Sequence, residues 1–512
     1  MDKQWFDEME AKIPKGGVRT RFAPSPTGYM HVGGLRTALY AYLTAKKDGG
    51  TFILRIEDTD ASRFVNGATE IIIDTLKGAG LIYDEGPDAG GPCAPYTQSE
   101  RRGIYGRYAE LLCEKGYAYY CFCEDSGRLS IESEKPEDDD GAERTPESAA
   151  AQWNDARDDA CRALPYEESK RRADSGEPFA IRMKAPREGE TTVVDMVFGT
   201  VTTPNKTLDD MILLKRDGLP TYNFANVVDD HLMGITHVMR GCEYISSTPK
   251  YNLLYEAFGW EIPAYITVSL IMRDANHKLS KRHGDPTYDD LLKQGYLPEA
   301  VLNYVALLGW SPGGEREIFS LPELVETFDV GGISKSPAIF DIGKLNYFNS
   351  EYIRAMQPGK FAEIARPYIH SAVKSGRICA DNIAPLLQAR LEKLSDIPPM
   401  LGFFDVLPEY DTGLYVNKKS KTDEKISLDM LRAARATLEA LTDWNTETVR
   451  DALMELAARL GVKNAALMWP LRIAVSGWAV TPGGAVEICS ILGRDESLRR
   501  IDCGINRLAS AV

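Results

Sequence analysis

The chain has 512 residues, of which 44% are hydrophobic and 26% charged, a composition typical of a globular protein too long for a single core. Its formal net charge of −15 gives no general attraction for nucleic acid, although a local basic surface could still bind phosphates. There is no run of about 20 apolar residues, the start is acidic and polar, and nine cysteines are too few for a disulfide framework. We therefore expect a cytoplasmic protein with reduced thiols.

The first elements that the sequence predicts form the opening of a parallel α/β sheet. Residues 31–50, "HVGGLRTALYAYLTAKKDGG", carry an apolar stripe at helical spacing and end in a Gly-Gly pair, which predicts a helix. The stripe consists of Leu35, Leu39, Tyr42 and Leu43. Residues 51–60, "TFILRIEDTD", predict a strand that ends in carboxylates. A second α/β block is predicted at 218–245, where short apolar runs are separated by Gly, Asp and His.

The remaining chain predicts a solvated segment and a helical C-terminal third. Residues 124–150 are acidic, contain proline and have few large apolar side chains, so we expect a solvated excursion. From about residue 346 the apolar residues recur at helical spacing. The two clearest stripes are Leu431, Ala434, Leu438 and Leu441, and Val449, Leu453, Leu456 and Leu460. A further helix is predicted with Thr481 as its cap, Pro482 in its first turn and Gly493 as its stop.

Two motifs some 250 residues apart have the chemistry that phosphate groups require. In "FAPSPTGYMHVGG", Gly33 and Gly34 stand where a loop becomes a helix, so free backbone N–H groups could face an anion beside His31. The loop "DANHKLSKRHGD" supplies four further donors, Lys278, Ser280, Lys281 and Arg282. Alone, the first motif is most often a plain turn and the second a solvated basic surface or an RNA-phosphate contact. Together they suit phosphoryl or nucleotidyl transfer, which needs donors around the developing charge.

The two motifs resemble the ATP-binding motifs of class I aminoacyl-tRNA synthetases, and most of residues 18–350 resemble the bacterial-type glutamyl-tRNA synthetase family. The segments that carry this likeness are "RIEDTD", "PTYNFANVVDDHLMGITHVMRGCEYI", "YLPEAVLNYVALLGWSPGG" and "ISKSPAIFDIGKLNYFN". The resemblance implies that ATP, with Mg²⁺, and L-glutamate give glutamyl-adenylate and pyrophosphate. Glutamate would then be transferred to the 3′-terminal adenosine of tRNA(Glu), and the sequence leaves open whether tRNA(Gln) is also charged.

The resemblance also implies which residues form the site. ATP would lie against His31, Gly33, Gly34, Lys278, Ser280 and Lys281, of which His31 and Lys281 would be catalytic. Glutamate would be bound by Arg21, Ala23, Ser25, Glu57, Tyr222, Asn226 and Arg240. Arginines suit its side-chain carboxylate and Glu57 its ammonium, whereas glutamine would leave the arginines facing a neutral amide. The general class I motif ends in a second histidine where this sequence has Gly34, which leaves more of the phosphate charge to the lysine loop and Mg²⁺.

Three cysteines resemble the zinc knuckle of some bacterial members of this family. They are Cys121, Cys123 and Cys161. A closed tetrahedral zinc site needs a fourth ligand, and Arg157 and Ala163 stand where those members have a tyrosine or a histidine. A Zn²⁺ site and buried thiols without metal therefore both stay open.

The resemblance implies a multidomain α/β protein with a Rossmann-like parallel sheet and an all-α anticodon-binding domain. The expected parts are a first catalytic half at 18–96, an inserted acceptor-binding domain at 97–220, a second catalytic half at 221–275, a lysine-loop and stem-contact domain at 276–345, and an α-helical anticodon-binding domain at 346–512. We expect a monomer whose partners are ATP, L-glutamate and tRNA(Glu).

Four other kinds of protein fit the sequence less well. Glutaminyl-tRNA synthetase typically has Pro-Glu-Pro-Asn-Gly in place of "PSPTG" and a β-barrel C-terminal region, and a shorter tRNA-modifying relative lacks the helical tail. A small-molecule nucleotidyltransferase would also use a His-Gly turn and a basic loop, but the RNA-sized extra domains argue against it. A catalytically silent RNA-binding paralogue would not need the intact set of Arg21, Glu57, Arg240 and Lys281.

Overall fold

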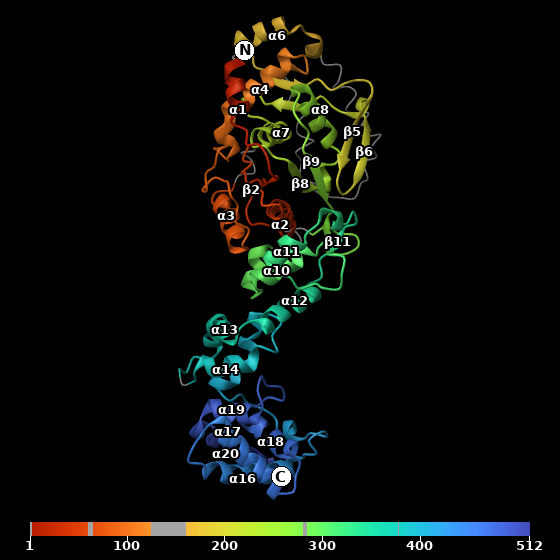
Figure 1. Ribbon diagram of the computed structural model, residues 1–512. Coiled ribbons are helices and arrows are strands. Elements are labelled where there is room, and N and C mark those ends of the chain that lie inside the picture. The colour runs from red at the N-terminus through yellow and green to blue at the C-terminus, as the bar shows by residue number, and fades with distance from the viewer. Residues whose placement is uncertain (1–2, 60–64, 124–159, 280–283, 377, 512) are drawn as a thin grey trace. The chain divides into compact units, whose positions relative to one another are not determined.

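A computed structural model describes most of the chain, which divides into two units (Figure 1). The described residues are 3–59, 65–123, 160–279, 284–376 and 378–511. The first unit comprises 1–291 and 301–341, and the second comprises 292–300 and 342–512. The excursion predicted at 124–150 lies outside the described residues. No helix among the described residues is long and apolar enough to cross a bilayer.

A six-stranded sheet forms the centre of the first unit. Across the sheet the strands are β2 (Thr51–Leu54), β1 (Arg19–Phe22), β8 (His237–Gly241), β9 (Ala264–Val268), β5 (Glu190–Asp195) and β6 (Gly199–Pro204). Every pairing is parallel except that of β5 with β6. A mostly parallel sheet requires crossover connections, which helices supply here. The predicted parallel α/β sheet is confirmed.

Helices connect the parallel strands. α2 (Val32–Lys47) joins β1 to β2, and Leu35, Leu39 and Leu43 of its predicted stripe are completely buried. α7 (Tyr222–Leu232) precedes β8, and α8 (Thr248–Phe258) joins β8 to β9. Both predicted α/β blocks are therefore present.

Smaller elements complete the first unit. An antiparallel sheet contains β3 (Ala118–Cys121), β4 (Ala180–Met183) and β7 (Ile212–Leu214), and a parallel pair contains β10 (Ile271–Met272) and β11 (Ala338–Ile339). Among the described residues up to 341, the remaining α-helices are α1 (Lys3–Ala11), α3 (Ala68–Gly78), α4 (Arg102–Glu114), α6 (Tyr166–Asp174), α9 (Tyr288–Lys293), α10 (Pro298–Ala306) and α11 (Leu321–Thr327), and the 3₁₀ turn η2 (Gln98–Arg101) precedes α4.

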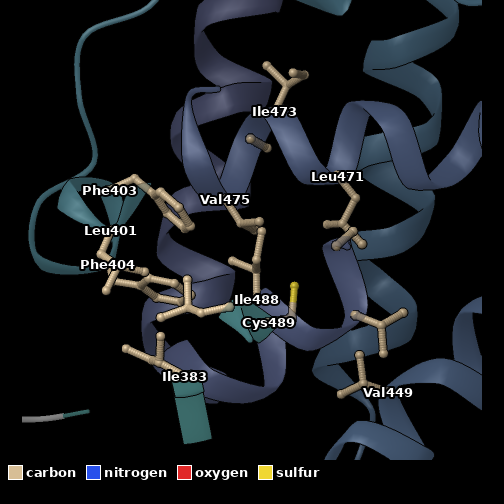
Figure 2. Close-up of a cluster of buried hydrophobic side chains, with 14 of the residues drawn as sticks. Ile383, Leu401, Phe403, Phe404, Val449, Leu471, Ile473, Val475, Ile488 and Cys489 are labelled. Carbon is tan, nitrogen blue, oxygen red and sulfur yellow. The ribbon is translucent and has the colours of Figure 1, made fainter. Parts of the chain in front are cut away.

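The second unit is helical, as its apolar spacing predicts. Its α-helices are α12 (Ile342–Ala355), α13 (Pro358–Ala372), α14 (Ala380–Leu387), α15 (Gly402–Asp405), α16 (Glu424–Glu439), α17 (Thr446–Arg459), α18 (Asn464–Ser476), α19 (Ala485–Leu492) and α20 (Arg494–Ala511). In Figure 2, Phe403 and Phe404 lie near Val475 and Ile488 in the buried cluster that holds these helices together. Apolar burial of this kind supplies most of the stability of such a helical domain.

The predicted stripes identify the buried faces of α16 and α17 correctly, but the last residue of each stripe lies beyond the end of its helix. Leu431, Ala434 and Leu438 are buried in α16. Leu441 lies beyond the end of that helix, and Leu460 is 40% exposed just after α17. An apolar residue in phase with a stripe can therefore follow the last helical turn.

The predicted start of α19 is wrong, and its predicted stop is confirmed. The helix begins at Ala485, and the Glu487 carboxylate accepts a hydrogen bond of 3.0 Å from the Gly484 N–H at its first turn. The Thr481 hydroxyl instead donates to the Gly483 carbonyl at 2.6 Å, which closes a preceding turn. Gly493 follows the last residue with φ of 79°, a conformation that glycine adopts without strain.

Arg500 is a fully buried cation within α20. Its guanidinium donates to the carbonyls of Phe403 at 2.7 Å and Val475 at 2.8 Å and pairs with Glu496 at 2.6 Å. Its neighbour Arg499 pairs with the same Glu496 but lies at the surface, with 56% of its side chain exposed. The pKa of Glu496 is lowered to about 2, because Arg499 donates hydrogen bonds to it and Arg500 adds to them against the opposing effect of burial.

We expect Arg500→Ala to lower the free energy of unfolding of the second unit by about 3 kcal/mol or more, since buried carbonyls lose their donors. Arg499→Ala is the matched control and should cost less than about 1 kcal/mol. Urea denaturation followed by tryptophan fluorescence measures both. Equal losses for the two variants would contradict the assigned difference.

Candidate active site

A pocket of about 280 Å³ lies at the carboxyl ends of strands β1, β8 and β9. Its walls also include the first turn of α2, the start of α7 and the chain that follows β9. Parallel α/β sheets place their ligand sites at this edge, where loops and helix starts converge. The pocket is therefore the candidate active site of the first unit.

Most of the predicted site residues line this pocket. Those at its walls are Arg21, Ala23, His31, Gly33, Gly34, Tyr222, Arg240 and Lys278. Ser25, Glu57 and Asn226 do not line it but lie in adjoining segments, because the Glu57 N–H donates to the Pro24 carbonyl and Asn226 donates to the Tyr222 carbonyl at 2.8 Å. Ser280, Lys281 and Arg282 lie outside the described residues.

The start of α2 uses its glycines differently from the prediction. His31 is the N-cap, and its Nδ1 accepts a hydrogen bond of 3.0 Å from the Gly34 N–H. That N–H is therefore already bound and does not face an anion freely. A Cβ at Gly33 would lie 3.0 Å from the same Nδ1, so the glycine makes room for the ring. Because Nδ1 accepts, the neutral ring carries its proton on Nε2, which leaves that atom as a donor.

Arg240 is a buried cation that forms no ion pair with a carboxylate among the described residues. Its guanidinium lies over the rings of Tyr251 and Tyr265, 4.8 and 4.6 Å from their centroids, and donates to Thr248 at 3.0 Å. Its Nε is buried without a hydrogen-bond partner, and none of the ion pairs among the described residues includes it. A buried cation of this kind is stabilised when an anion enters the pocket.

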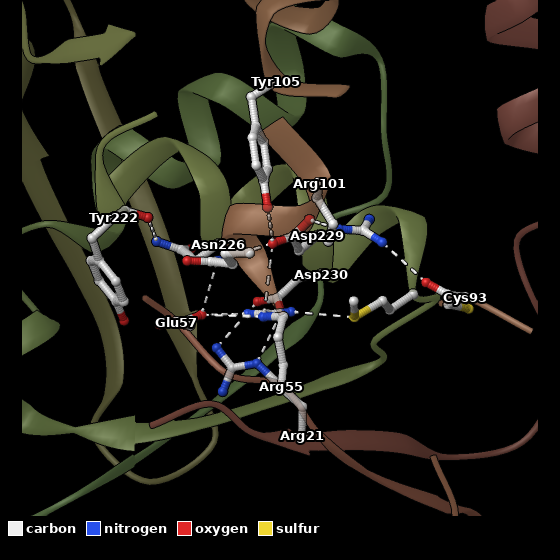
Figure 3. A network of polar contacts seen from close by, with 12 residues as sticks. Arg21, Arg55, Glu57, Cys93, Arg101, Tyr105, Tyr222, Asn226, Asp229 and Asp230 are labelled. Atoms are coloured by element: carbon white, nitrogen blue, oxygen red, sulfur yellow. Dashed lines mark hydrogen bonds and ion pairs between the residues drawn. The ribbon is translucent and has the colours of Figure 1, made fainter. Parts of the chain in front are cut away.

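Arg21, in contrast, is already paired. Its Nε and Nη2 donate to the two carboxylate oxygens of Asp230 at 2.9 and 3.2 Å (Figure 3). Its Nη1 donates to the Met239 carbonyl at 3.1 Å. A guanidinium has five N–H groups, so donors remain for a ligand in the pocket. Burial would raise the pKa of Asp230, but Arg21 and Arg55 together hold it below its ordinary value.

Glu57 lies beside the same ion pair. Arg55, which is completely buried, donates to Glu57 Oε1 at 2.8 Å and to Asp230 Oδ1 at 2.7 Å. Gln98 approaches the same Glu57 oxygen at 3.4 Å. Burial raises the pKa of Glu57 to about 7, and Arg55 and Arg21 oppose this increase. The carboxyl group therefore changes its charge near neutral pH.

Several residues around the pocket were not identified from the sequence. Arg55 and Asp230 lie within the motifs "RIEDTD" and "NFANVVDDH", but nothing local indicates that their side chains meet across 175 residues. Arg36 lines the pocket from α2 and donates to the carbonyls of Leu308 and Ser269. Glu243 lines it after β8. The only feature of the sequence that could have identified these residues is their position within the quoted motifs.

The three predicted thiols lie together outside the pocket. The sulfur atoms of Cys121, Cys123 and Cys161 are all within 4.8 Å of one another, and those of Cys123 and Cys161 are 3.8 Å apart. The Phe122 N–H donates to the sulfur of Cys161 at 3.4 Å. Among the described residues the group contains no fourth His, Asp or Glu.

A parallel sheet with a nucleotide-type pocket at its carboxyl edge, followed by a helical unit, is the architecture of a class I aminoacyl-tRNA synthetase. The family model of the tRNA synthetases class I (E and Q), catalytic domain, matches residues 17–347, and that of the anticodon binding domain matches residues 360–505. The chain belongs to the class I tRNA synthetases of the glutamyl and glutaminyl type.

Individual relatives are similar over nearly their whole length. A glutamate–tRNA ligase of Clostridium botulinum is 53% identical over 491 residues, which are 96% of this chain and 98% of that protein. The one of Clostridium tetani is 52% identical over 97% of this chain and 99% of its own. The crystal structure of a glutamate tRNA ligase from Elizabethkingia meningosepticum in complex with its amino acid matches with a TM-score of 0.82 and 36% identity, over 96% of this chain and all of that one.

We expect Gly33→Ala to displace the His31 ring and break its cap on α2. The loss of a helix cap costs about 1 kcal/mol, which should lower the temperature of thermal denaturation by about 2–4 °C. Gly103→Ala, in the first turn of α4 with nothing within 4 Å of the added methyl group, is the control and should not lower that temperature. A Gly33→Ala variant as stable as the control would show that the ring does not need this space.

Proposed function

We propose that this chain is a glutamate–tRNA ligase. It activates L-glutamate with ATP to glutamyl-adenylate and pyrophosphate, and it transfers glutamate to the 3′-terminal adenosine of tRNA(Glu). The observation that carries this proposal is the environment of Arg240, a buried guanidinium that lines the pocket without a carboxylate partner among the described residues. An acidic amino acid supplies the missing charge, whereas a neutral amide does not.

Glutamate would lie between two groups of opposite charge. Its side-chain carboxylate would accept hydrogen bonds from Arg240 and from the remaining donors of Arg21, beside Tyr222. Its ammonium would lie against Glu57, whose hydrogen bonds from the described residues all end on Oε1 and so leave Oε2 as an acceptor. Ser25 and Asn226, in segments next to Glu57, would complete the amino end, and Ala23 would line the wall. This arrangement fixes which carboxylate of the substrate reacts.

ATP would lie against the first turn of α2, with His31, Gly33 and Gly34 on one side and Lys278 at the start of the lysine loop on the other. The α-carboxylate of glutamate attacks the α-phosphorus, and the bond to the leaving pyrophosphate breaks. Ser280 and Lys281 are proposed to stabilise the charge on the leaving phosphates, and bound Mg²⁺ supplies further charge neutralisation. The ribose hydroxyl of tRNA then attacks the activated carbonyl, and AMP leaves.

We propose that the helical second unit, most of which matches the anticodon-binding family, contacts the anticodon end of tRNA. We also propose the division into five parts, at 18–96, 97–220, 221–275, 276–345 and 346–512. In this division the catalytic, acceptor-binding, stem-contact and anticodon-binding parts would each contact a different region of the substrates. We propose that the protein acts as a monomer. We also propose that it acts in the cytoplasm, where tRNA, ATP and glutamate are available.

Exchange of labelled pyrophosphate into ATP tests the proposed activation step. The assay is run with glutamate, glutamine or aspartate, and with tRNA(Glu), with tRNA(Gln) or without tRNA. We expect exchange that depends on glutamate and does not occur with glutamine, and charging of tRNA(Glu) in a separate acylation assay. Exchange supported by glutamine as well as by glutamate, or charging of tRNA(Gln) with glutamine, would overturn the assignment.

Lys281→Ala tests the proposed role of the lysine loop. Loss of one donor to the developing charge should lower the rate of exchange about 10²–10³-fold. The KM for glutamate should change little, because Lys281 is assigned to the phosphates. Lys15→Ala, an exposed lysine near the N-terminus, is the control and should exchange at the wild-type rate. An unchanged exchange rate in Lys281→Ala would require another residue for this role.

We also propose that the three thiols bind Zn²⁺. Tetrahedral coordination with Zn–S distances of about 2.3 Å places sulfur atoms about 3.8 Å apart, and this separation is found between Cys123 and Cys161. The Phe122 N–H supports the thiolate of Cys161, as hydrogen bonds from neighbouring backbone commonly do at metal sites. Cys121 would be the third ligand, and a water molecule or another residue the fourth.

Metal analysis of the purified chain tests this zinc proposal. We expect a single Zn²⁺ per chain, measured by inductively coupled plasma mass spectrometry, that is lost in Cys123→Ser. Cys379→Ser, an exposed cysteine of the second unit, is the control and should keep the metal. A chain that contains no zinc and takes up none from added Zn²⁺ would instead have structural thiols at this position.

A further inference from the structure

Arg55 connects the two charged groups that are assigned to glutamate, although it does not itself line the pocket. It follows directly after β2 and is completely buried. Its Nη1 donates to Asp230 Oδ1 at 2.7 Å, and its Nη2 and Nε donate to Glu57 Oε1 at 2.8 and 3.2 Å. One rigid guanidinium therefore contacts a carboxylate from α7 and a carboxylate from the loop after β2 (Figure 3).

The contact with Asp230 extends to Arg21. Asp230 Oδ1 accepts from both Arg55 and Arg21, and Asp230 Oδ2 accepts from Arg21 alone. The position of the Arg21 guanidinium at the pocket wall therefore depends on an anchor that Arg55 holds from the other side. Because the guanidinium of Arg55 is planar and its N–H directions are fixed, it holds the carboxylates that it contacts in fixed positions and also supplies positive charge.

Arg55 is also the main source of positive charge at Glu57. The network around it contains three guanidinium groups and three carboxylates among the described residues. These are Arg21, Arg55 and Arg101, and Glu57, Asp229 and Asp230. Arg101 pairs with Asp229 at 2.7 Å and Arg21 with Asp230, so Arg55 is the only one of these three guanidinium groups that donates to Glu57. Its removal would leave Glu57 buried beside a network with an excess of negative charge.

We propose that Arg55 is a positioning residue for glutamate, which fixes the separation of Glu57 and Arg21 and favours the charged form of the Glu57 carboxylate. The proposal rests on the proposed function, because it assigns Glu57 to the substrate ammonium and Arg21 to the substrate carboxylate. Arg55 itself would not contact glutamate. It would act through Glu57 and Arg21, which would contact it.

The titration of Glu57 gives this role a distinctive signature. Burial raises the pKa of Glu57 to about 7, and the Arg55 cation opposes the increase. Only the ionised carboxylate attracts an ammonium ion strongly, so kcat/KM for glutamate should rise with pH through the pKa of Glu57. Without Arg55 the pKa of Glu57 rises further, and the midpoint of this pH profile should move upward by about one to three pH units.

Arg55→Gln, Arg55→Lys and Arg101→Gln form a matched set for the test. Each is assayed by glutamate-dependent pyrophosphate exchange from pH 6 to pH 9, with KM values for glutamate and ATP and the temperature of thermal denaturation. Arg101 is a suitable control because it is buried in the same network but donates to Asp229 and two backbone carbonyls, not to Glu57 or Asp230.

For Arg55→Gln we expect a glutamate KM at least tenfold higher, an ATP KM within about twofold of the wild-type value and an upward shift of the pH midpoint. Arg55→Lys restores the charge without the planar fork, so its midpoint should return toward the wild-type value while its glutamate KM stays raised. Arg101→Gln should lose thermal stability but keep the wild-type midpoint.

A purely structural role predicts a different result. Arg55→Gln and Arg101→Gln would then lose stability together, with equal changes in glutamate KM and no shift of the midpoint, and this result would overturn the proposal. If Arg55→Gln does not fold, Arg55→Lys decides: an unchanged glutamate KM refutes the positioning role, and a raised KM supports it. A wild-type protein without glutamate-dependent exchange would instead refute the proposed function itself.

Discussion

The buried ion network beneath the pocket is the interaction on which the rest of the first unit depends. Its ionised side chains come from β1, from the loop after β2, from η2 and from α7, and hydrogen bonds link them into one cluster. Each isolated ion would cost several kcal/mol to bury, so the loss of any one member destabilises the cluster by leaving a buried charge unpaired. The network therefore fixes the ends of the sheet strands relative to α7, and the pocket takes its shape from this arrangement.

One cation of the pocket, Arg240, lies outside this balanced network. Arg21 shares Asp230 with Arg55, whereas the charge of Arg240 is met by aromatic rings and a hydroxyl group. The pocket thus combines a wall whose charges are already matched with the guanidinium of Arg240, which pairs with no carboxylate among the described residues. In the proposed function, selectivity for an anionic side chain would follow from the difference between these two arginines more than from their number.

The sequence predicts local features of this protein well and long-range contacts poorly. The helix with its stripe at Leu35, Leu39 and Leu43 and the strand after it follow from spacing that spans a few residues. The start of α19 was misplaced because Thr481 and Pro482 form a turn, while the backbone of Gly484 receives the Glu487 side chain. Propensity rules do not distinguish a turn that precedes a helix from the first turn of the helix itself.

The same limit applies to the candidate site. The glycine motif at the start of α2 identified His31, Gly33 and Gly34 as pocket residues from its own chemistry, whereas Arg240 was identified only through the family resemblance. No pattern indicated that Nδ1 of His31 would cap α2, or that Arg55 would join Glu57 to Asp230. The cap is local but uses a histidine, which is not among the usual capping residues. The contact of Arg55 with Asp230 spans 175 residues, and no local spacing in a sequence without aligned relatives indicates it.

The distance along the chain between the members of the ion network has a consequence for biosynthesis. Asp230 lies 209 residues after Arg21 and 175 after Arg55, so it leaves the ribosome long after both arginines. At about 5–20 residues per second, the nascent chain would wait roughly 10–40 s for the carboxylate that neutralises Arg21. During that time β1, α2 and β2 cannot bury their charged ends. The pocket is therefore a late product of translation, which forms only when α7 docks onto strands made much earlier.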